Sequence, residues 1–194
     1  FSSGLHIETR ESTYITLKTN TQERLRIDSN GRLLVGTTTE GHAAADELTI
    51  SNTTSSADMG ITLRSATNGQ GAIYFSDGTS GADEYRGIIN YNHSNDALSV
   101  YTSATERLRI DASGRMVIGH TSNIGIANHN GRFQLHGTDY DTATMSIVHN
   151  GNASHGAFLF FASQRSGSPG GSTVLQNNDS VGTIRFHAGD GTDM

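Results

Sequence analysis

The chain has 194 residues, of which only 16% are charged, and its net charge is −6. Nucleic-acid binding needs a basic face and membrane insertion needs a long apolar run, and the sequence offers neither. Because Cys is absent, disulfide frameworks and thiolate sites are excluded, and the 23 Gly without a three-residue period exclude collagen. The chain begins with Phe1 and carries no signal-peptide pattern, so we expect a fragment of a longer protein.

An internal repeat is the main feature of the sequence. The run ERLRIDSNGRLLVG over residues 23–36 returns as ERLRIDASGRMVIG over residues 106–119, an offset of 83 (106 − 23). We expect the positions that recur unchanged to form a structural motif. Those singled out for the motif are Glu23, Arg24, Arg26, Asp28, Gly31 and Gly36 in the first copy, and Glu106, Arg107, Arg109, Asp111, Gly114 and Gly119 in the second.

The repeat predicts how the chain is divided. Residues 1–40 read as the end of a preceding β repeat, residues 41–123 as a complete repeat, and residues 124–194 as the start of a following one. Phe75 aligns with Phe160, whereas Gly87 aligns with Gly182, so the later copy holds about ten extra residues. We place them in an inserted surface loop near residues 163–173.

The repeated run predicts a β-hairpin. Leu25 and Ile27 alternate with Arg24 and Arg26, which predicts that the two apolar side chains are buried and that the arginines face the other way. Leu108, Ile110 and Arg107 are expected to do the same in the second copy. A tight turn follows, and Gly31 and Gly114 are expected there at positive φ.

The rest of the chain also reads as short strands bounded by Gly, Asn, Ser or Asp. Further strands are expected at residues 48–50, 61–63, 72–75, 87–91, 98–101, 132–135, 145–148, 157–161 and 182–186. The one candidate helix, residues 42–47, is too short to be stable by itself. The sequence therefore predicts an all-β fold.

Strands this short bury little apolar surface in one chain. Small cores need disulfides, a metal or oligomerisation, and the first is excluded by the lack of Cys. We therefore expect copies of the chain to share a core in an elongated assembly. A monomeric β-sandwich is the alternative that periodicity leaves open.

Two segments resemble the shaft repeats of phage tail fibres of the marine and cyanobacterial type. They are NYNHSNDALSV over residues 90–100 and TERLRID over residues 105–111; residues 182–193 also resemble a fibre segment. Such fibres often end in an endosialidase-type intramolecular chaperone domain. The resemblance implies an elongated, fibrous homotrimer in the virion tail fibre, with other virion tail proteins and a host surface glycan or protein receptor as partners.

No residues are assigned to catalysis, cofactor or metal binding. The nine His include no H-x-H pair, and Asp190 and Asp193 lack the further oxygen ligands that calcium requires, so they read as a turn. No G-x-S-x-G elbow occurs, and the acidic pairs Asp83–Glu84 and Asp139–Asp141 lie in turn-like stretches. We therefore expect a protein that is not an enzyme.

The expected function is mechanical: a trimeric spacer that presents a receptor-binding tip. The 163–173 loop is the candidate for receptor contact by the segment itself. One alternative is a tailspike-like enzyme that cleaves polysaccharide, which would need paired acids in a groove and aromatic side chains for sugars. Aromatic residues are only 7% of the chain and Trp is absent, which argues against it. The other alternative is a repeat of a bacterial surface adhesin.

Overall fold

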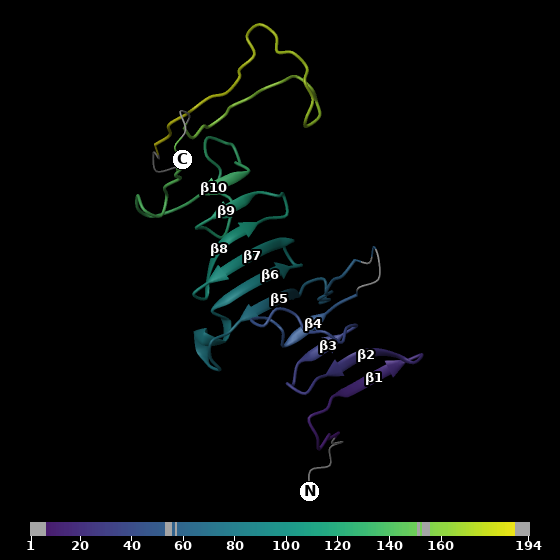
Figure 1. The fold of residues 1–194 in the computed structure, drawn as a ribbon. Helices are drawn as coiled ribbons and strands as arrows, with labels where there is room; N and C mark the ends of the chain where they lie inside the picture. Colours follow the sequence, from purple (N-terminus) through teal and green to yellow (C-terminus); the bar gives the residue numbers. More distant parts are fainter. Residues whose placement is uncertain (1–6, 53–55, 57, 151, 153–155, 189–194) are drawn as a thin grey trace. The chain divides into compact units, whose positions relative to one another are not determined.

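The structure is a computed structural model, and it describes residues 7–52, 56, 58–150, 152 and 156–188 (Figure 1). Within these residues the fold is all-β, as the sequence predicts: it has two sheets and one short 3₁₀ helix, η1 (Gly81–Tyr85). The chain divides into two compact units, residues 1–62 and residues 63–194, and each holds one sheet. Each unit is described by itself.

The first unit holds a four-stranded sheet in the order β1-β2-β3-β4. Its strands are β1 (Ile15–Thr19), β2 (Gln22–Ile27), β3 (Leu33–Val35) and β4 (Leu48–Ile50). The first three pair antiparallel as a meander, and β4 then pairs parallel with β3 after a crossover connection. The strand predicted at residues 48–50 is confirmed as β4.

The second unit holds a six-stranded sheet in which the strands lie side by side in sequence order (Figure 1). All neighbours pair antiparallel except the last pair, which is parallel. The strands are β5 (Gln70–Phe75), β6 (Gly87–Asn92), β7 (Ala97–Thr102), β8 (Thr105–Ile110), β9 (Met116–Ile118) and β10 (Phe133–Leu135). The helix η1 lies in the connection between β5 and β6.

Strands β7 to β10 pair in the same way as β1 to β4. Both sheets carry a β-bulge at the equivalent place, between Leu17 and Lys18 in one and between Val100 and Tyr101 in the other. After the hairpin, the Gly36 amide donates to the Arg24 carbonyl at 3.0 Å, and the Gly119 amide donates to the Arg107 carbonyl at 3.2 Å. The repeated sequence thus adopts the same local structure twice.

The register gives each sheet one face made of apolar side chains, which we call its apolar face. In the first sheet this face comprises Ile15, Leu17, Leu25, Ile27, Leu33, Val35, Leu48 and Ile50. In the second it comprises Ile73, Phe75, Ile89, Tyr91, Leu98, Val100, Leu108, Ile110, Met116, Ile118, Phe133 and Leu135. The residues between them point to the other face, which we call the polar face.

The prediction that Leu25, Ile27, Leu108 and Ile110 are buried is wrong for the single chain. Ile27 is 38% exposed, and the other three are only half-buried. The buried apolar residues of the described chain are Leu34, Ala97 and Val117, which lie on the polar faces. The cause is that each sheet is one layer, and among the described residues no second sheet or helix packs on its apolar face.

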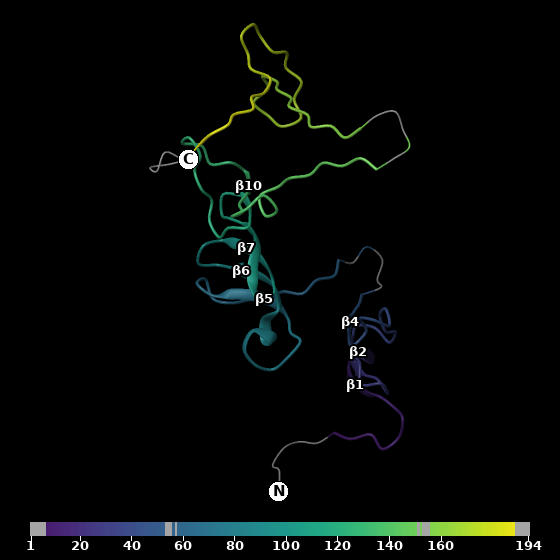
Figure 2. The ribbon, with the colours of Figure 1, turned by 90° about the vertical axis from the view of Figure 1, so that its left-hand side faces the viewer.

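Four predicted strands are absent: residues 61–63, 145–148, 157–161 and 182–186 are described without strand pairing. Residues 138–150 and 156–188 form turns and irregular segments without strands (Figures 1 and 2). Gly182 nevertheless lies against the Phe161 side chain, as Gly87 lies against its partner Phe75 in β5. This contact is one residue later than the sequence alignment with Phe160. The β5–β6 ladder continues into β7 through β6, whereas residues 157–161 and 182–186 form no ladder in the described chain.

The turns between β1 and β2 and between β7 and β8 contain no glycine, although both central residues have positive φ. The values are 49° and 62° for Asn20 and Thr21, and 50° and 58° for Ser103 and Ala104. These are the signs of a type I′ turn, which matches the twist of antiparallel strands but strains residues that carry a Cβ. The turns therefore hold local strain at equivalent places in the two sheets.

We expect Ala104→Gly to stabilise the chain. Relief of the left-handed strain outweighs the extra entropy of glycine in the unfolded chain, which leaves a net gain of about 0.5 kcal/mol. Denaturant titration at equilibrium checks this. Ala72→Gly in strand β5 is the control and should destabilise; equal destabilisation by both variants would contradict the turn assignment.

We expect Gly119→Ala to be strongly destabilising. Gly119 has φ +79°, and a Cβ there would collide with the carbonyl oxygen of His136, as one at Gly36 would with that of Ser51. The backbone strain alone costs about 1–2 kcal/mol, and the collision adds to it. Gly60→Ala is the matched control, since its Cβ would meet nothing within 4 Å and its φ is not positive. Thermal melts in which both variants match the parent would contradict this account.

Candidate functional site

The repeated motif is built around one carboxylate in each hairpin turn. Asp28 accepts hydrogen bonds from the Asn30 and Arg32 amides at 2.9 and 3.0 Å, and from the Arg32 guanidinium at 2.7 Å. Asp111 accepts the same three bonds from Ser113 and Arg115, at 2.9, 3.0 and 2.7 Å. The carboxylate therefore takes the amides that the turn would leave unpaired.

The turn glycines have the predicted conformation. Gly31 has φ +85° and Gly114 has φ +70°, so the predicted hairpin is confirmed. Each glycine amide donates to the carbonyl of the turn aspartate, at 3.0 Å for Gly31 and 2.8 Å for Gly114. The hydrogen bonds and the glycine together fix where the chain reverses, and hence the register of the next strand.

The charges in the turns shift the titration of the aspartates. The Arg32 side chain and the donated amides hold the pKa of Asp28 below its ordinary value. Burial acts to raise the pKa of Asp111, but the hydrogen bonds from Arg115 and Ser113 outweigh it, and the net shift is also downward. Arg32 further binds Asp46 at 2.9 Å, which joins the turn to the crossover before β4.

A second ion pair recurs on the polar faces. The Arg26 guanidinium donates both Nε and Nη2 to Glu23, at 2.6 and 2.9 Å, and Arg109 donates to Glu106 at 2.7 and 2.6 Å. The hydrogen bonds from Arg26 lower the pKa of Glu23. Such bidentate pairs fix the orientation of both side chains. The pairs form within one chain, so they leave no charge for a neighbouring chain to neutralise.

Tyrosines extend these pairs differently in the two sheets. Tyr101 donates its hydroxyl to Glu106 at 3.0 Å, and burial followed by this contact raises the pKa of Tyr101. In the first sheet the Tyr14 ring instead lies 3.9 Å from the Arg26 guanidinium carbon. Either arrangement covers one side of the ion pair, which reduces its contact with water.

Arg24 and Arg107 do not follow the predicted alternation. Both lie at the β-bulge, outside the paired register. Arg24 donates to the Thr19 hydroxyl at 2.9 Å, and Arg107 donates to the Thr102 hydroxyl at 3.3 Å. Strand alternation places both threonine side chains on the same side as the apolar face. The bulge therefore places these two arginines at a margin of the apolar face and not on the polar face.

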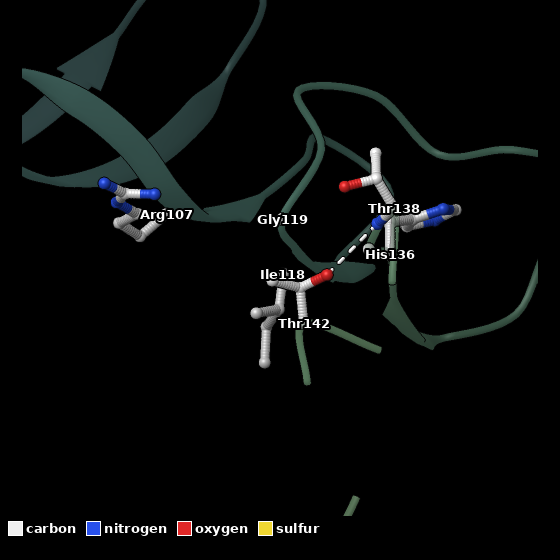
Figure 3. A pocket seen from close by; sticks show the side chains of 7 residues that line it. Arg107, Ile118, Gly119, His136, Thr138 and Thr142 are labelled. Carbon is white, nitrogen blue, oxygen red and sulfur yellow. Dashed lines mark hydrogen bonds between the residues drawn. The ribbon is translucent and has the colours of Figure 1, made fainter. Parts of the chain in front are cut away.

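A pocket of about 340 Å³ lies where the chain leaves β9 (Figure 3). It is lined by Arg107, Ile118, Gly119, His136, Gly137, Thr138 and Thr142. The Thr138 amide donates to the Thr142 hydroxyl at 3.1 Å, while the Arg107 guanidinium and the His136 ring extend to opposite sides in this view. No carboxylate lines the pocket, so it lacks the acid pair of a glycosidase.

The other titratable residues do not converge on a site. Asp83 and Glu84 lie exposed in η1, and Asp139 accepts from the Thr142 amide at 2.9 Å in a turn. The His120 and His136 rings lie in a tilted arrangement, with their centroids 5.3 Å apart. Among the described residues no three His, Asp or Glu side chains are grouped as metal ligands, and Asp190 and Asp193 lie outside them.

The 163–173 loop is closed by contacts that the sequence did not indicate. Arg165 forms two hydrogen bonds with Asp179, at 2.6 and 2.9 Å, and a third with the Gln176 side chain at 2.7 Å. The Arg165 amide also donates to the Thr173 carbonyl at 3.1 Å. The opposite charges of Arg165 and Asp179 could have indicated this ion pair, but the two residues lie 14 positions apart in a Ser/Gly/Asn-rich run.

Comparisons with known proteins give the chain no family. No protein-family model matches the chain. No curated protein shows significant similarity to it. In the part of the chain that the structure describes, no helix is long and apolar enough to cross a membrane.

The turn carboxylates predict a stability that depends on pH. Their pKa values are lower in the folded chain, so their stabilising contribution is complete above the ordinary Asp value of about 4 and is lost as pH falls through the folded values. We expect the double variant Asp28→Asn, Asp111→Asn to be less stable at pH 7 and to lose less stability on acidification than the parent.

Urea midpoints at pH 7 and at several values below pH 4 measure this difference. Asp77→Asn is the matched control, because its ion pair with Arg86 is 3.7 Å long and solvent-exposed. The control should follow the pH profile of the parent. If the double variant lost as much stability below pH 4 as the parent, the turn carboxylates would contribute nothing to stability.

Proposed function

We propose that the chain is a structural segment of a phage tail fibre, where it serves as a homotrimeric spacer that carries a receptor-binding tip. The resemblance of residues 90–100 and 105–111 to fibre shaft repeats first suggests this function. Virion tail proteins and a host surface glycan or protein would be its partners. The repeat boundaries near residues 40 and 123 belong to the same proposal.

The observation that carries the proposal is the recurrence of one hydrogen-bonded unit that has no core of its own. The same bulge, turn carboxylate and ion pair occur in β1–β4 and in β7–β10. In both sheets the apolar face remains partly exposed, as Leu17 at 59% and Phe133 at 53% show. Elements that cannot bury their apolar side alone are typical of proteins that stack repeats or share a core.

The polysaccharide-cleaving alternative finds less support. Glycosidases place two carboxyl groups on either side of a sugar-binding cleft. The acidic side chains of the repeated motif are instead bound to arginines within 2.6–2.9 Å. A carboxylate that is ion-paired with arginine is not available to donate a proton to a glycosidic oxygen.

Sedimentation equilibrium of the chain at micromolar concentration tests the proposal. We expect three copies per particle, and we expect unfolding and dissociation to occur together, so that the melting temperature rises with concentration. A folded monomer of 20.6 kDa would contradict the proposal.

A reducing-end assay on host surface polysaccharide separates the spacer from the tailspike enzyme. The spacer should release no more reducing ends than a heat-denatured sample. Release above that level would favour the enzyme, whereas binding without release agrees with the proposed fibre segment, which has a host surface glycan among its partners.

A further inference from the structure

The second sheet offers two faces of opposite character, and no sheet or helix of the described residues covers its apolar face, which Leu63 approaches at Gly71. We propose that the apolar face of β5–β10 packs against the same faces of the other two copies of this chain in the trimer. The inference rests on the proposed function and adds to it by naming the contact surface. It makes the polar face the one that stays in water.

The apolar face is continuous and uncharged across the sheet. One row runs through Ile73, Ile89, Val100, Leu108, Ile118 and Leu135, and the next runs through Tyr91, Leu98, Ile110, Met116 and Phe133. Ile73 is 51% exposed and Ile89 44%. Charged side chains lie at its margins: Arg107 beside Thr102 at one, and Asp96, which accepts from the Tyr91 hydroxyl at 3.2 Å, at the other. A contiguous apolar face of this kind marks an interaction surface.

The polar face is already occupied by groups of its own chain. Asn90, Ser99 and Gln134 are buried there, and Arg109 is bound to Glu106. The Gln134 side chain accepts from the Ile124 amide at 3.0 Å and donates to the Ile124 carbonyl at 2.6 Å, so the connection before β10 lies against this face. A partner on this side would have to displace the Gln134–Ile124 contact and the Arg109–Glu106 pair, although the buried Asn90 Oδ1 has no hydrogen-bond partner.

Three observations favour another copy as the partner. The first sheet carries an equivalent apolar face, so each copy offers the same surface at both repeats. The face holds no charge that would call for a partner of opposite sign. With strands about 4.8 Å apart and a rise of about 3.3 Å per residue, six strands present on the order of 500 Å² in projection, more than half of the roughly 800 Å² per partner of a specific interface.

Adjacent residues of β5 provide a matched test. Ile73 on the apolar face is 51% exposed in the single chain, and Tyr74 on the polar face is 57% exposed, so neither substitution removes a buried side chain. The chain has no Cys, so Ile73→Cys and Tyr74→Cys each carry one thiol. For each variant, the maleimide labelling rate of the assembled chain is divided by its rate in denaturant. This ratio measures how far assembly protects the thiol at each position.

We expect the Ile73→Cys thiol to react at least about tenfold more slowly than the Tyr74→Cys thiol. Its labelling rate should rise when the chain is diluted below the assembly midpoint. We also expect Ile73→Asp to raise the dissociation constant at least about tenfold and Tyr74→Asp to leave it unchanged. Phe133→Cys on β10, 53% exposed, should repeat the Ile73 result at the opposite edge of the sheet.

The outcomes separate this inference from the proposed function. An oligomer in which the Ile73 and Phe133 positions label as fast as Tyr74 would overturn the interface and leave the fibre segment standing. Protection of Ile73 in a monomer at every concentration would mean that a segment of the chain itself covers the face. A monomer in which both thiols react rapidly would overturn the interface and the fibre segment together.

Discussion

An apolar sheet face must leave water, and in the described part of the chain neither sheet has a second sheet or a helix packed on its apolar face. A β-sheet stabilises a fold when one side is buried against another layer. Here the fully buried apolar side chains are Leu34, Ala97 and Val117, all on the polar faces. The apolar faces hold most of the aliphatic side chains of the strands, so the stability of the fold depends on what covers them.

The polar faces set the geometry that this burial requires. Turn carboxylates at Asp28 and Asp111 fix the hairpin reversal, and the bulge in each first hairpin turns Glu23 and Glu106 toward Arg26 and Arg109. Bonds of this kind add little net stability when exposed, but they specify register. A one-residue slip would move the apolar set to the wrong side, so the motif ensures that both sheets present it on one face.

The sequence predicted the features that local chemistry determines. Exact recurrence of ERLRID and of the turn glycines identified the hairpin and the positive φ at Gly31 and Gly114, because few residues allow that conformation. The sequence did not predict the positive φ values in the Asn20-Thr21 and Ser103-Ala104 turns, because these turns contain no glycine. The parallel pairing of β10 with β9 was also not predicted, since it depends on a crossover whose path the sequence does not specify.

For the candidate site, the sequence predicted which residues belong to the motif but not which side chains form ion pairs with one another. The repeated Glu, Arg and Asp were identified, yet the partners Arg32 and Arg115 lie four residues beyond the aspartates, across a turn. The bulge reversed the predicted side of Arg24 and Arg107, because one extra residue changes the alternation. Strands at residues 157–161 and 182–186 were predicted from apolar pattern alone, and pattern cannot supply the neighbouring strand that a ladder needs.

The most direct measurement is a crystal structure of the assembled chain. The account predicts that Val100 and Leu108, half-buried in the single chain, lie fully buried beneath apolar-face residues of another copy, with Glu106 and Arg109 on the outer side. A structure in which the apolar face of β5–β10 is covered by residues 138–188 of its own chain, or lies open to solvent, would contradict it.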